Sequence, residues 1–117
     1  MLDYSIIIPV YCNSETLDEL MHQIDYKIIK RNSDLNGQVI FCDDGSTDNS
    51  FEKLIEINKS YVHTKIIRLT RNFGQISAIL AGIMNSESKA YIIISADLQD
   101  PVELINEFLK YHFKDKF

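Results

Sequence analysis

The sequence contains little cysteine, proline or glycine and no long apolar run, and these shortages exclude several classes of protein. Its 117 residues include two cysteines, two prolines and four glycines. Cys12 and Cys42 are too few and too far apart to form a zinc cluster, and a cytosolic protein would keep them reduced. No apolar run approaches the roughly 18 residues of a membrane span. Neither of the two common glycine-rich phosphate loops is present.

Basic residues are also scarce. Twelve lysines and arginines stand against 17 aspartates and glutamates, a formal net charge of -5, and no basic stripe is available for the phosphates of a nucleic acid. A small anion held through a metal ion is compatible with this balance. Near the N-terminus, Asp3 stands where a secretory signal would carry lysines, and no small-residue cleavage site follows an apolar stretch. We therefore expect a cytoplasmic protein that does not bind nucleic acid.

Length and composition indicate one globular domain over residues 1–117. Hydrophobic residues make up 45% of the chain and charged residues 25%, which is far from the composition of a disordered protein. A chain of this length falls in the usual range for one domain. No repeat, low-complexity tract or linker divides it.

Hydrophobic periodicity predicts four strand–helix units. Strands are expected at residues 4–11, 38–45, 64–72 and 90–97. Each is followed by apolar residues at helical spacing: Leu17, Leu20, Met21, Ile24 and Ile28; Phe51, Leu54 and Ile55; Phe73, Ile76, Leu80 and Ile83; Leu104, Ile105 and Phe108. Ser46 or Thr47 is expected to cap the second helix, whereas the fourth has Asp100 as N-cap, Pro101 at the first position and Glu103 at the third.

Four such units in series predict an α/β fold: a three-layer, Rossmann-like arrangement of four parallel strands with helices on both faces. The unbroken isoleucine runs at 6–8 and 92–94 support this, because strands of a parallel sheet are buried on both faces. Ligands of such folds bind at the carboxyl ends of the strands. The functional site is therefore expected at that edge.

The segment DDGSTDNS follows the second strand and has two readings. Asp, Gly, Ser and Asn are typical of turns and helix caps, so the segment is compatible with a purely structural role. The adjacent carboxylates of Asp43 and Asp44 repel each other unless donors satisfy them. The amide proton of a nucleobase or a ribose hydroxyl would be such a donor.

Asp97 and Gln99 follow the fourth strand with one residue between them. In an extended segment both side chains point the same way, and their oxygens suit Mg²⁺, which takes one or two protein carboxylates and completes its shell with water and substrate phosphates. The alternative is that both simply face solvent. Asp100 is better explained as a helix cap than as a catalytic group.

The remaining exits carry residues with open roles. Arg71 is suited to clamp a phosphate, but with Lys65 and Arg68 it is equally compatible with solvated charge. Tyr11 would stack on a base or cover the sheet edge. Gly74 permits close backbone approach or ends a turn. The three histidines lie far apart without ligand spacing, and no nucleophile–base constellation is visible.

Four strings, taken together, resemble a known family. IIIPVY, FCDDGSTDNS, TRNFGQISAILAG and SADLQDP, in this order and spacing, are similar to the family 2 glycosyltransferases of the GT-A fold, and within them to polyprenyl-phosphate sugar transferases such as dolichyl-phosphate mannose synthase. The likeness covers nearly all the chain. Each string alone is weak, but four in register are specific.

The resemblance implies a UDP- or GDP-sugar donor at the carboxyl edge, a polyprenyl-phosphate acceptor and inversion at the anomeric carbon. It also implies roles for individual residues: Pro9 and Tyr11 would border the base, Asp43 and Asp44 would hold base and ribose, Arg71 would lie near the phosphates, and Asp97 and Gln99 would bind Mg²⁺ or Mn²⁺. The metal would neutralise the leaving diphosphate as a Lewis acid.

Two departures from the family pattern qualify these expectations. Ser95 stands where the metal motif usually has its first aspartate, so metal binding without nucleotide is expected to be weak. The chain also stops where family members continue into the acceptor-binding half, so the catalytic base is expected beyond the C-terminus and no candidate is named. We expect the N-terminal part of a longer glycosyltransferase domain, with feeble donor binding, self-association through exposed apolar surface and contact with a membrane surface.

Two alternatives remain. A receiver-like signalling domain would need an acidic pair after the first strand, where no acid occurs before Glu15, and a phosphoryl-accepting aspartate after the third, where Arg71 stands. A non-catalytic nucleotide-binding or interaction fragment on a glycosyltransferase scaffold is the other. Loss of a metal carboxylate at Ser95 favours this second alternative.

Overall fold

A computed structural model describes residues 1–99 and 101–114 and shows one parallel four-stranded sheet. The strands are β1 (Leu2–Val10), β2 (Gly37–Asp43), β3 (Thr64–Arg68) and β4 (Ser88–Ile93), in the order β3-β2-β1-β4. The register aligns Val10 with Asp43 and Asp43 with Arg68, so the first three strands end side by side.

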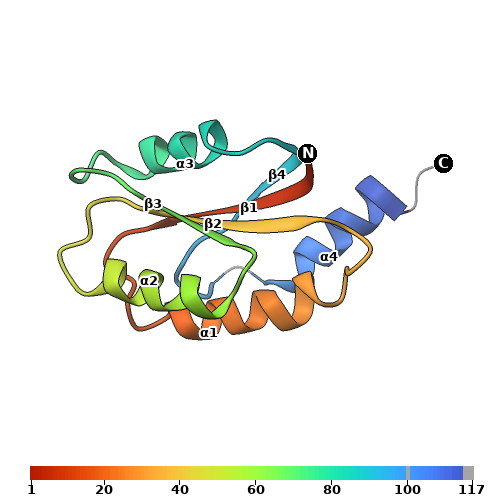
Figure 1. The fold of residues 1–117 in the computed structure, drawn as a ribbon, viewed down its shortest axis with the longest axis horizontal. Coiled ribbons are helices and arrows are strands. Elements are labelled where there is room, and N and C mark those ends of the chain that lie inside the picture. The colour runs from red at the N-terminus through yellow and green to blue at the C-terminus, as the bar shows by residue number, and fades with distance from the viewer. Residues whose placement is uncertain (100, 115–117) are drawn as a thin grey trace.

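The helices form two unequal layers around the sheet (Figure 1). They are α1 (Leu17–Ile24), which continues into a π-helical turn η1 (Asp25–Ile29), α2 (Ser50–Ser60), α3 (Gln75–Met84), and α4 (Glu103–Leu109), which continues into a π-helical turn η2 (Lys110–Lys114). Helices α1, α2 and α4 cover one face of the sheet, and α3 covers the other. The predicted three-layer α/β fold is confirmed.

The strand order excludes the receiver-like alternative. Sheets of that type have the order 2-1-3-4-5, in which the third strand lies next to the first. Here β3 lies beside β2, and β4 is the neighbour of β1. The chain therefore reverses direction of strand addition between β3 and β4, which places the exits of β1 and β4 next to each other.

Two hydrophobic clusters fill the spaces between the layers. Alternate residues of β1 point to opposite faces, so Ile6 and Ile8 pack toward α1, α2 and α4 while Ile7 packs toward α3. The first cluster includes whole faces of α1 and of the sheet, with Leu54 and Ile57 of α2. The cluster beneath α3 is much smaller, since its buried members are Ile7, Ile40, Cys42 and Ala78.

The predicted apolar face of α3 was wrong in most of its residues. Phe73, Ile76 and Leu80 are exposed, and Ala78 and Gly82 are the buried residues of the helix. The helix lies so close to the sheet that a Cβ at Gly82 would come within 2.8 Å of both Cys42 Sγ and Ile7 Cγ2. Only small residues fit between α3 and the sheet at this distance, so the largest apolar residues of the helix do not mark its inner face.

The predicted caps of α2 and α4 also differ from the structure. Helix α2 begins at Ser50 after Asn49, and neither Ser46 nor Thr47 caps it. Helix α4 begins at Glu103 after Val102, two residues later than predicted. Asp100, the predicted cap of α4, lies outside the described residues.

Candidate functional site at the carboxyl edge of the sheet

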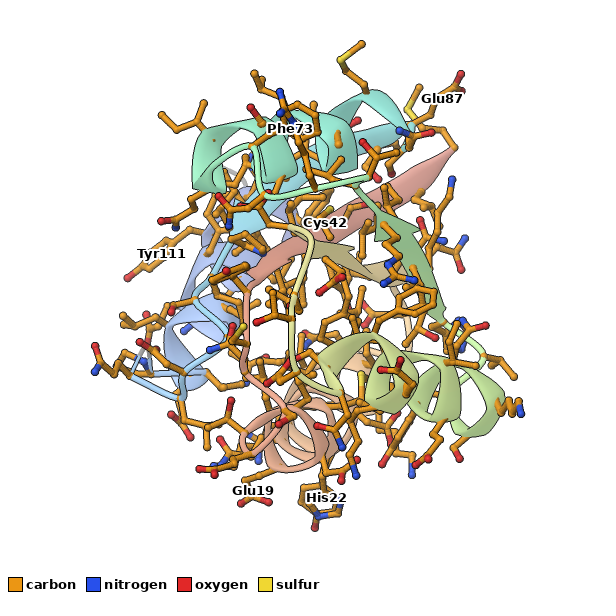
Figure 2. All side chains as sticks on the ribbon, turned by 90° about the vertical axis from the view of Figure 1, so that its left-hand side faces the viewer. Glu19, His22, Cys42, Phe73, Glu87 and Tyr111 are labelled. Carbon is orange, nitrogen blue, oxygen red and sulfur yellow. The ribbon has the colours of Figure 1, made fainter. Side chains whose placement is uncertain are left out.

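Two adjoining clefts open at the carboxyl edge of the sheet, the edge that faces the viewer in Figure 2. The inner cleft has a volume of about 160 Å³ and lies between the exits of β1 and β4. The outer cleft, about 670 Å³, lies between the loops after β2 and β3. Tyr11, which is 45% exposed, lines both clefts. Together they form one polar run along the edge where ligands of such folds bind.

Most of the predicted site residues gather here. Pro9, Tyr11 and Asp44 line the inner cleft with Ser95, and Arg71 lines the outer cleft. The residues lining these two clefts do not include Asp43, Asp97 or Gln99. Asp43 is buried beneath the loop after β2, whereas Asp97 and Gln99 are exposed on the loop after β4. Asp43, Asp44 and Asp97 all lie at the carboxyl edge of the sheet, as predicted.

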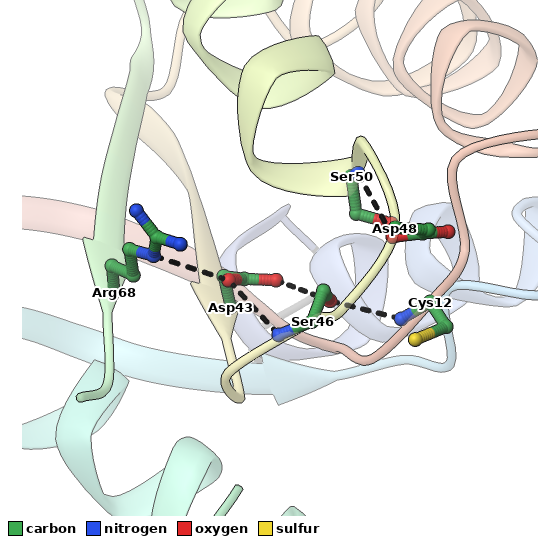
Figure 3. A network of polar contacts seen from close by, with 6 residues as sticks. All are labelled: Cys12, Asp43, Ser46, Asp48, Ser50 and Arg68. Atoms are coloured by element: carbon green, nitrogen blue, oxygen red, sulfur yellow. Dashed lines mark hydrogen bonds and ion pairs between the residues drawn. The ribbon is translucent and has the colours of Figure 1, made fainter. Parts of the chain in front are cut away.

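Asp43 lies on the α2 side of the sheet in a network of polar contacts (Figure 3). Its Oδ1 accepts a hydrogen bond from Ser46 Oγ at 2.5 Å and its Oδ2 accepts one from the Ser46 amide at 3.3 Å. The Nε of Arg68 lies 3.9 Å from Oδ2. Asp43 itself is completely buried. The carboxylate is therefore satisfied within the chain.

Asp44 turns to the α3 side and holds the start of that helix. Its Oδ1 accepts from the Phe73 amide at 2.8 Å and its Oδ2 accepts from the Gly74 amide at 3.1 Å. Gly74 has a φ of 105°, a conformation that favours glycine. The two adjacent carboxylates thus point to opposite faces and find different donors. Their roles toward base and ribose remain predictions.

Gly45 brings the loops after β2 and β3 into contact. Its φ is 69°, and a Cβ at this position would lie 2.4 Å from the carbonyl carbon of Arg71 and 2.5 Å from the amide nitrogen of Asn72. No side chain fits there without moving backbone. The glycine of the DDGS segment therefore allows the two loops that line the outer cleft to pack against each other.

The outer cleft has two arginines, each held against a phenylalanine. The guanidinium of Arg71 lies 4.8 Å from the ring centroid of Phe73, and that of Arg68 lies 4.2 Å from the ring centroid of Phe51. Arg68 was not selected from the sequence, where it could not be told from solvated charge. Its pairing with the register partner Asp43 is the signal that identifies it.

The loop after β4 is a turn, not the extended segment expected from the sequence. Asp97 Oδ1 accepts from Ser95 Oγ at 2.8 Å and from the Gln99 amide at 3.1 Å. Leu98 between them has a φ of 66°. The same-side alternation predicted for Asp97 and Gln99 therefore fails, because the aspartate side chain bends the backbone onto itself.

The donors around Asp97 favour its ionised form. The hydrogen bond from Ser95, together with that from the Gln99 backbone, lowers the pKa of the Asp97 carboxyl below its usual value of 3.8. At neutral pH this exposed loop therefore presents an anionic oxygen to solvent.

This donor set fits a hard cation of low protein coordination. Among the described residues, no group of three or more His, Cys, Asp or Glu is placed to hold a metal ion. A closed structural metal site is thus not formed by them. One carboxylate with neighbouring neutral oxygens is instead the partial shell that Mg²⁺ takes when phosphates and water supply the remainder.

Two residues with positive φ and one long-range hydrogen bond were not predicted from the sequence. Cys12 and Leu98 are the non-glycine residues with positive φ in the described part of the chain, and both lie in loops of this edge; such strain is common at functional sites. Thr16 Oγ1 donates to the carbonyl of Ala96 at 2.5 Å, which joins the start of α1 to the exit of β4. Contacts between residues this distant in sequence leave no local signal.

Comparison with known proteins identifies the family. The model of glycosyl transferase family 2 matches residues 5–117. The chain therefore belongs to this family, whose members are enzymes that transfer sugars. The resemblance inferred from the four sequence strings is confirmed.

Two similar proteins are each about three times as long as this chain. An uncharacterised glycosyltransferase of Bacillus subtilis, YkcC, is 38% identical over 109 residues, which cover 93% of this chain and 33% of that protein. A dolichol-phosphate mannosyltransferase of Pyrococcus furiosus is 34% identical over 106 residues, or 91% of this chain and 29% of the relative. The chain thus spans about a third of these proteins.

Solved structures confirm the fold at lower identity. The mannosyltransferase PcManGT from Pyrobaculum calidifontis, solved in complex with GDP-Man and Mn²⁺, superposes with a TM-score of 0.78 at 17% identity, over 95% of this chain and 34% of that one. S. aureus TarS 1-349 in complex with UDP-GlcNAc gives 0.73 at 19% identity, over 92% and 30%. In the described part of the chain, no helix has the length and apolar character to cross a membrane.

Proposed function

We propose that this chain is the donor-binding half of an inverting glycosyltransferase that moves a sugar from a nucleoside-diphosphate donor to a lipid-phosphate or glycan acceptor. The observation that carries the proposal is the pair of adjoining clefts that runs from Arg71 past Tyr11 to Ser95, where Ser95 donates a hydrogen bond to the exposed carboxylate of Asp97. Support comes from the relative named a dolichol-phosphate mannosyltransferase and from neighbours solved with GDP-Man or UDP-GlcNAc.

The outer cleft is the place for the nucleotide. Tyr11 is half-exposed between the two clefts and offers its ring to a base. Arg71 and Arg68 carry the positive charge of this cleft, and a guanidinium suits the paired oxygens of a phosphate. With Pro9 and Asp44 lining the inner cleft, the sugar would lie toward the exit of β4.

Asp97 and Gln99 would hold Mg²⁺ or Mn²⁺ on the loop after β4. When bound, the metal would stabilise the charge of the leaving diphosphate. Asp97 brings an ionised, exposed carboxylate to this position, and the neutral hydroxyl of Ser95 cannot replace a second one. We expect the cation to bind weakly without nucleotide, because the diphosphate must supply the missing anionic oxygens.

The acceptor side of the reaction is not assigned to any described residue. We propose that the base, and the contacts to a polyprenyl phosphate, come from segments equivalent to the part of the relatives that this chain does not cover. A lipid acceptor would place the enzyme at the cytoplasmic face of a membrane. Alone, this chain would self-associate through its exposed apolar residues, which sedimentation velocity measures.

A thermal-shift panel tests the donor role. UDP, GDP, UDP-glucose and GDP-mannose are each added with and without Mn²⁺, since a ligand that binds only the folded state raises its stability. We expect at least one nucleotide to raise the melting temperature, more with Mn²⁺ than without. The Mn²⁺ increment should disappear in Asp97→Asn and persist in Glu52→Gln, a matched change of an exposed acid on α2. No shift with any ligand would refute the donor role.

The second candidate is a non-catalytic nucleotide-binding fragment, which Ser95 in the metal loop favours. Ser95→Asp in the whole protein separates the two. A working transferase already uses its single carboxylate, so its transfer rate should change little while Mn²⁺ affinity rises. An absence of transfer in the whole protein, both before and after the change, would favour the non-catalytic candidate.

A further inference from the structure

Two hydrogen bonds link Cys12 to Asp43 through Ser46, and in both the donor lies on the Cys12 side (Figure 3). A carboxylate only accepts, so the single hydroxyl proton of Ser46 is donated to Asp43 Oδ1 at 2.5 Å. The Ser46 oxygen is then free to accept, and it accepts from the backbone amide of Cys12 at 2.9 Å. The exit of β2 thereby holds one particular amide of the loop after β1.

That amide belongs to a residue that needs to be held. Cys12 has a φ of 55°, in the left-handed region that side chains other than glycine avoid. Its neighbours are fixed as well, because the Tyr11 amide donates to Asn13 Oδ1 at 2.8 Å and the Asn13 amide donates to Ser50 Oγ at 2.9 Å. Three consecutive amides of this loop are thus bound by side chains.

The loop after β1 begins with Tyr11, which lines both clefts. The placement of Tyr11 depends on the path of this loop, and release of Cys12 from the left-handed region would change the path of the chain next to Tyr11. A charged acceptor strengthens the bonds that feed into it. Burial of Asp43 excludes the water that would compete with Ser46.

We propose that Asp43 and Ser46 are positioning residues that set the placement of Tyr11 in the donor site. The proposal deepens the donor function proposed above and rests on it for its biological meaning. It assigns Asp43 a different task from the one implied by the family resemblance. The buried carboxylate acts on the nucleotide through Ser46, Cys12 and Tyr11, without touching the base.

Hydrogen exchange tests the link without any ligand. In ¹⁵N-resolved spectra of Ser46→Ala, we expect the Cys12 amide to exchange about tenfold faster than in the unaltered chain, the ratio for losing one ordinary hydrogen bond. Thr47→Ala is the matched control. Thr47 Oγ1 contacts Cys12 only at its sulfur, at 3.4 Å, so exchange of the Cys12 amide should stay within about twofold.

Two further variants guard against a general loss of structure. Ser46→Thr keeps the hydroxyl and should restore slow exchange at Cys12. Asp43→Asn keeps an acceptor oxygen without the charge and should give an intermediate rate. Equal exchange of Cys12 in Ser46→Ala and in the unaltered chain would overturn the proposal, as would faster exchange spread over the whole of β1 instead of this loop.

A double-mutant cycle tests the consequence for the nucleotide. With UDP or GDP and Mn²⁺ as probes, Ser46→Ala should weaken binding about tenfold, and the pair Ser46→Ala with Tyr11→Ala should bind no more weakly than Tyr11→Ala alone. Additive losses would overturn the proposal, because independent residues add. If the unaltered chain binds neither nucleotide, the donor function fails, while amide exchange still decides the positioning link.

Discussion

The two faces of the sheet solve the same packing problem in different ways. On one face, α1, α2 and α4 bury large apolar residues and turn charged ones outward, among them Asp18, Glu19, Glu52 and Glu56. On the other face, α3 carries no charged residue between Gln75 and Met84. Its outer side shows Ile76, Leu80 and Met84, which are 73%, 51% and 82% exposed.

The difference shows that α3 is held by the close approach of its backbone to the sheet, and not by burial of large side chains. A helix that is apolar on every side is usually buried on every side. Here small residues bring α3 against the sheet, and the large ones remain outside. The comparison predicts that the two layers respond differently to the same kinds of substitution.

The largest contrast is expected between two leucines. Leu54→Ala removes a completely buried side chain beneath α2 and should lower the free energy of unfolding by about 3 kcal/mol. Leu80→Ala on the outside of α3 should lower it by less than about 1 kcal/mol. Urea unfolding measures both. Equal losses would show that α3 is covered by a second copy of the chain under the conditions used.

The next contrast tests close packing directly. Gly82→Ala inserts a methyl group 2.8 Å from Cys42 Sγ and Ile7 Cγ2, and we expect a loss of about 2 kcal/mol in the free energy of unfolding. Helix propensity acts the other way and favours alanine by about 1 kcal/mol. The control is Ser77→Ala on the same helix, which is exposed. A stabilised Gly82→Ala variant would contradict the distance between α3 and the sheet.

A smaller effect is expected in the thicker layer. The Tyr4 hydroxyl is buried without a hydrogen-bond partner among the described residues, and burial raises the pKa of Tyr4 to about 12. Because Tyr4→Phe removes an unsatisfied polar group, it should raise the free energy of unfolding by about 1 kcal/mol. Tyr91→Phe is the matched control, since the Tyr91 hydroxyl donates to the Ser86 carbonyl at 2.8 Å and its removal should be destabilising.

The smallest effect concerns the two thiols. Hydrogen bonds from Thr47 lower the pKa of exposed Cys12, whereas burial raises the pKa of Cys42 beneath α3 to about 12. A lower pKa means more thiolate at neutral pH, so Cys12 should react first with an alkylating reagent. Thr47→Ala should slow the alkylation of Cys12 a few-fold relative to the unaltered chain. Raising the pH should remove this difference between the variant and the unaltered chain. Rapid labelling of Cys42 in the folded chain would mean that α3 opens readily.

The sequence predicts the fold well because its signals are local. The isoleucine runs of β1 and β4 and the polar residues at the strand exits place the clefts at the correct edge. The inner face of α3 could not be predicted in the same way, since the spacing of large apolar residues says nothing about how near a helix approaches its sheet. Gly82 becomes informative only when Ile7 and Cys42 lie beneath it.

The candidate site follows the same division. Asp43, Asp44 and Asp97 are found at the predicted edge, yet their partners were not predictable. Ser46 contacts Cys12, 34 positions away, and Thr16 contacts Ala96, 80 positions away. Tertiary contacts at such separations depend on the strand order β3-β2-β1-β4, which hydrophobic periodicity does not specify.

The bond from Thr16 to the Ala96 carbonyl gives this strand order a mechanical meaning. It joins Thr16, the residue before α1, to the loop that would receive the cation. A shift of that loop on ligand capture would pull on α1, and α1 shares its buried face with α2 and the sheet. Ligand binding at the loop after β4 would then displace the layer formed by α1, α2 and α4. Helix α3, on the opposite face of the sheet, would not be displaced.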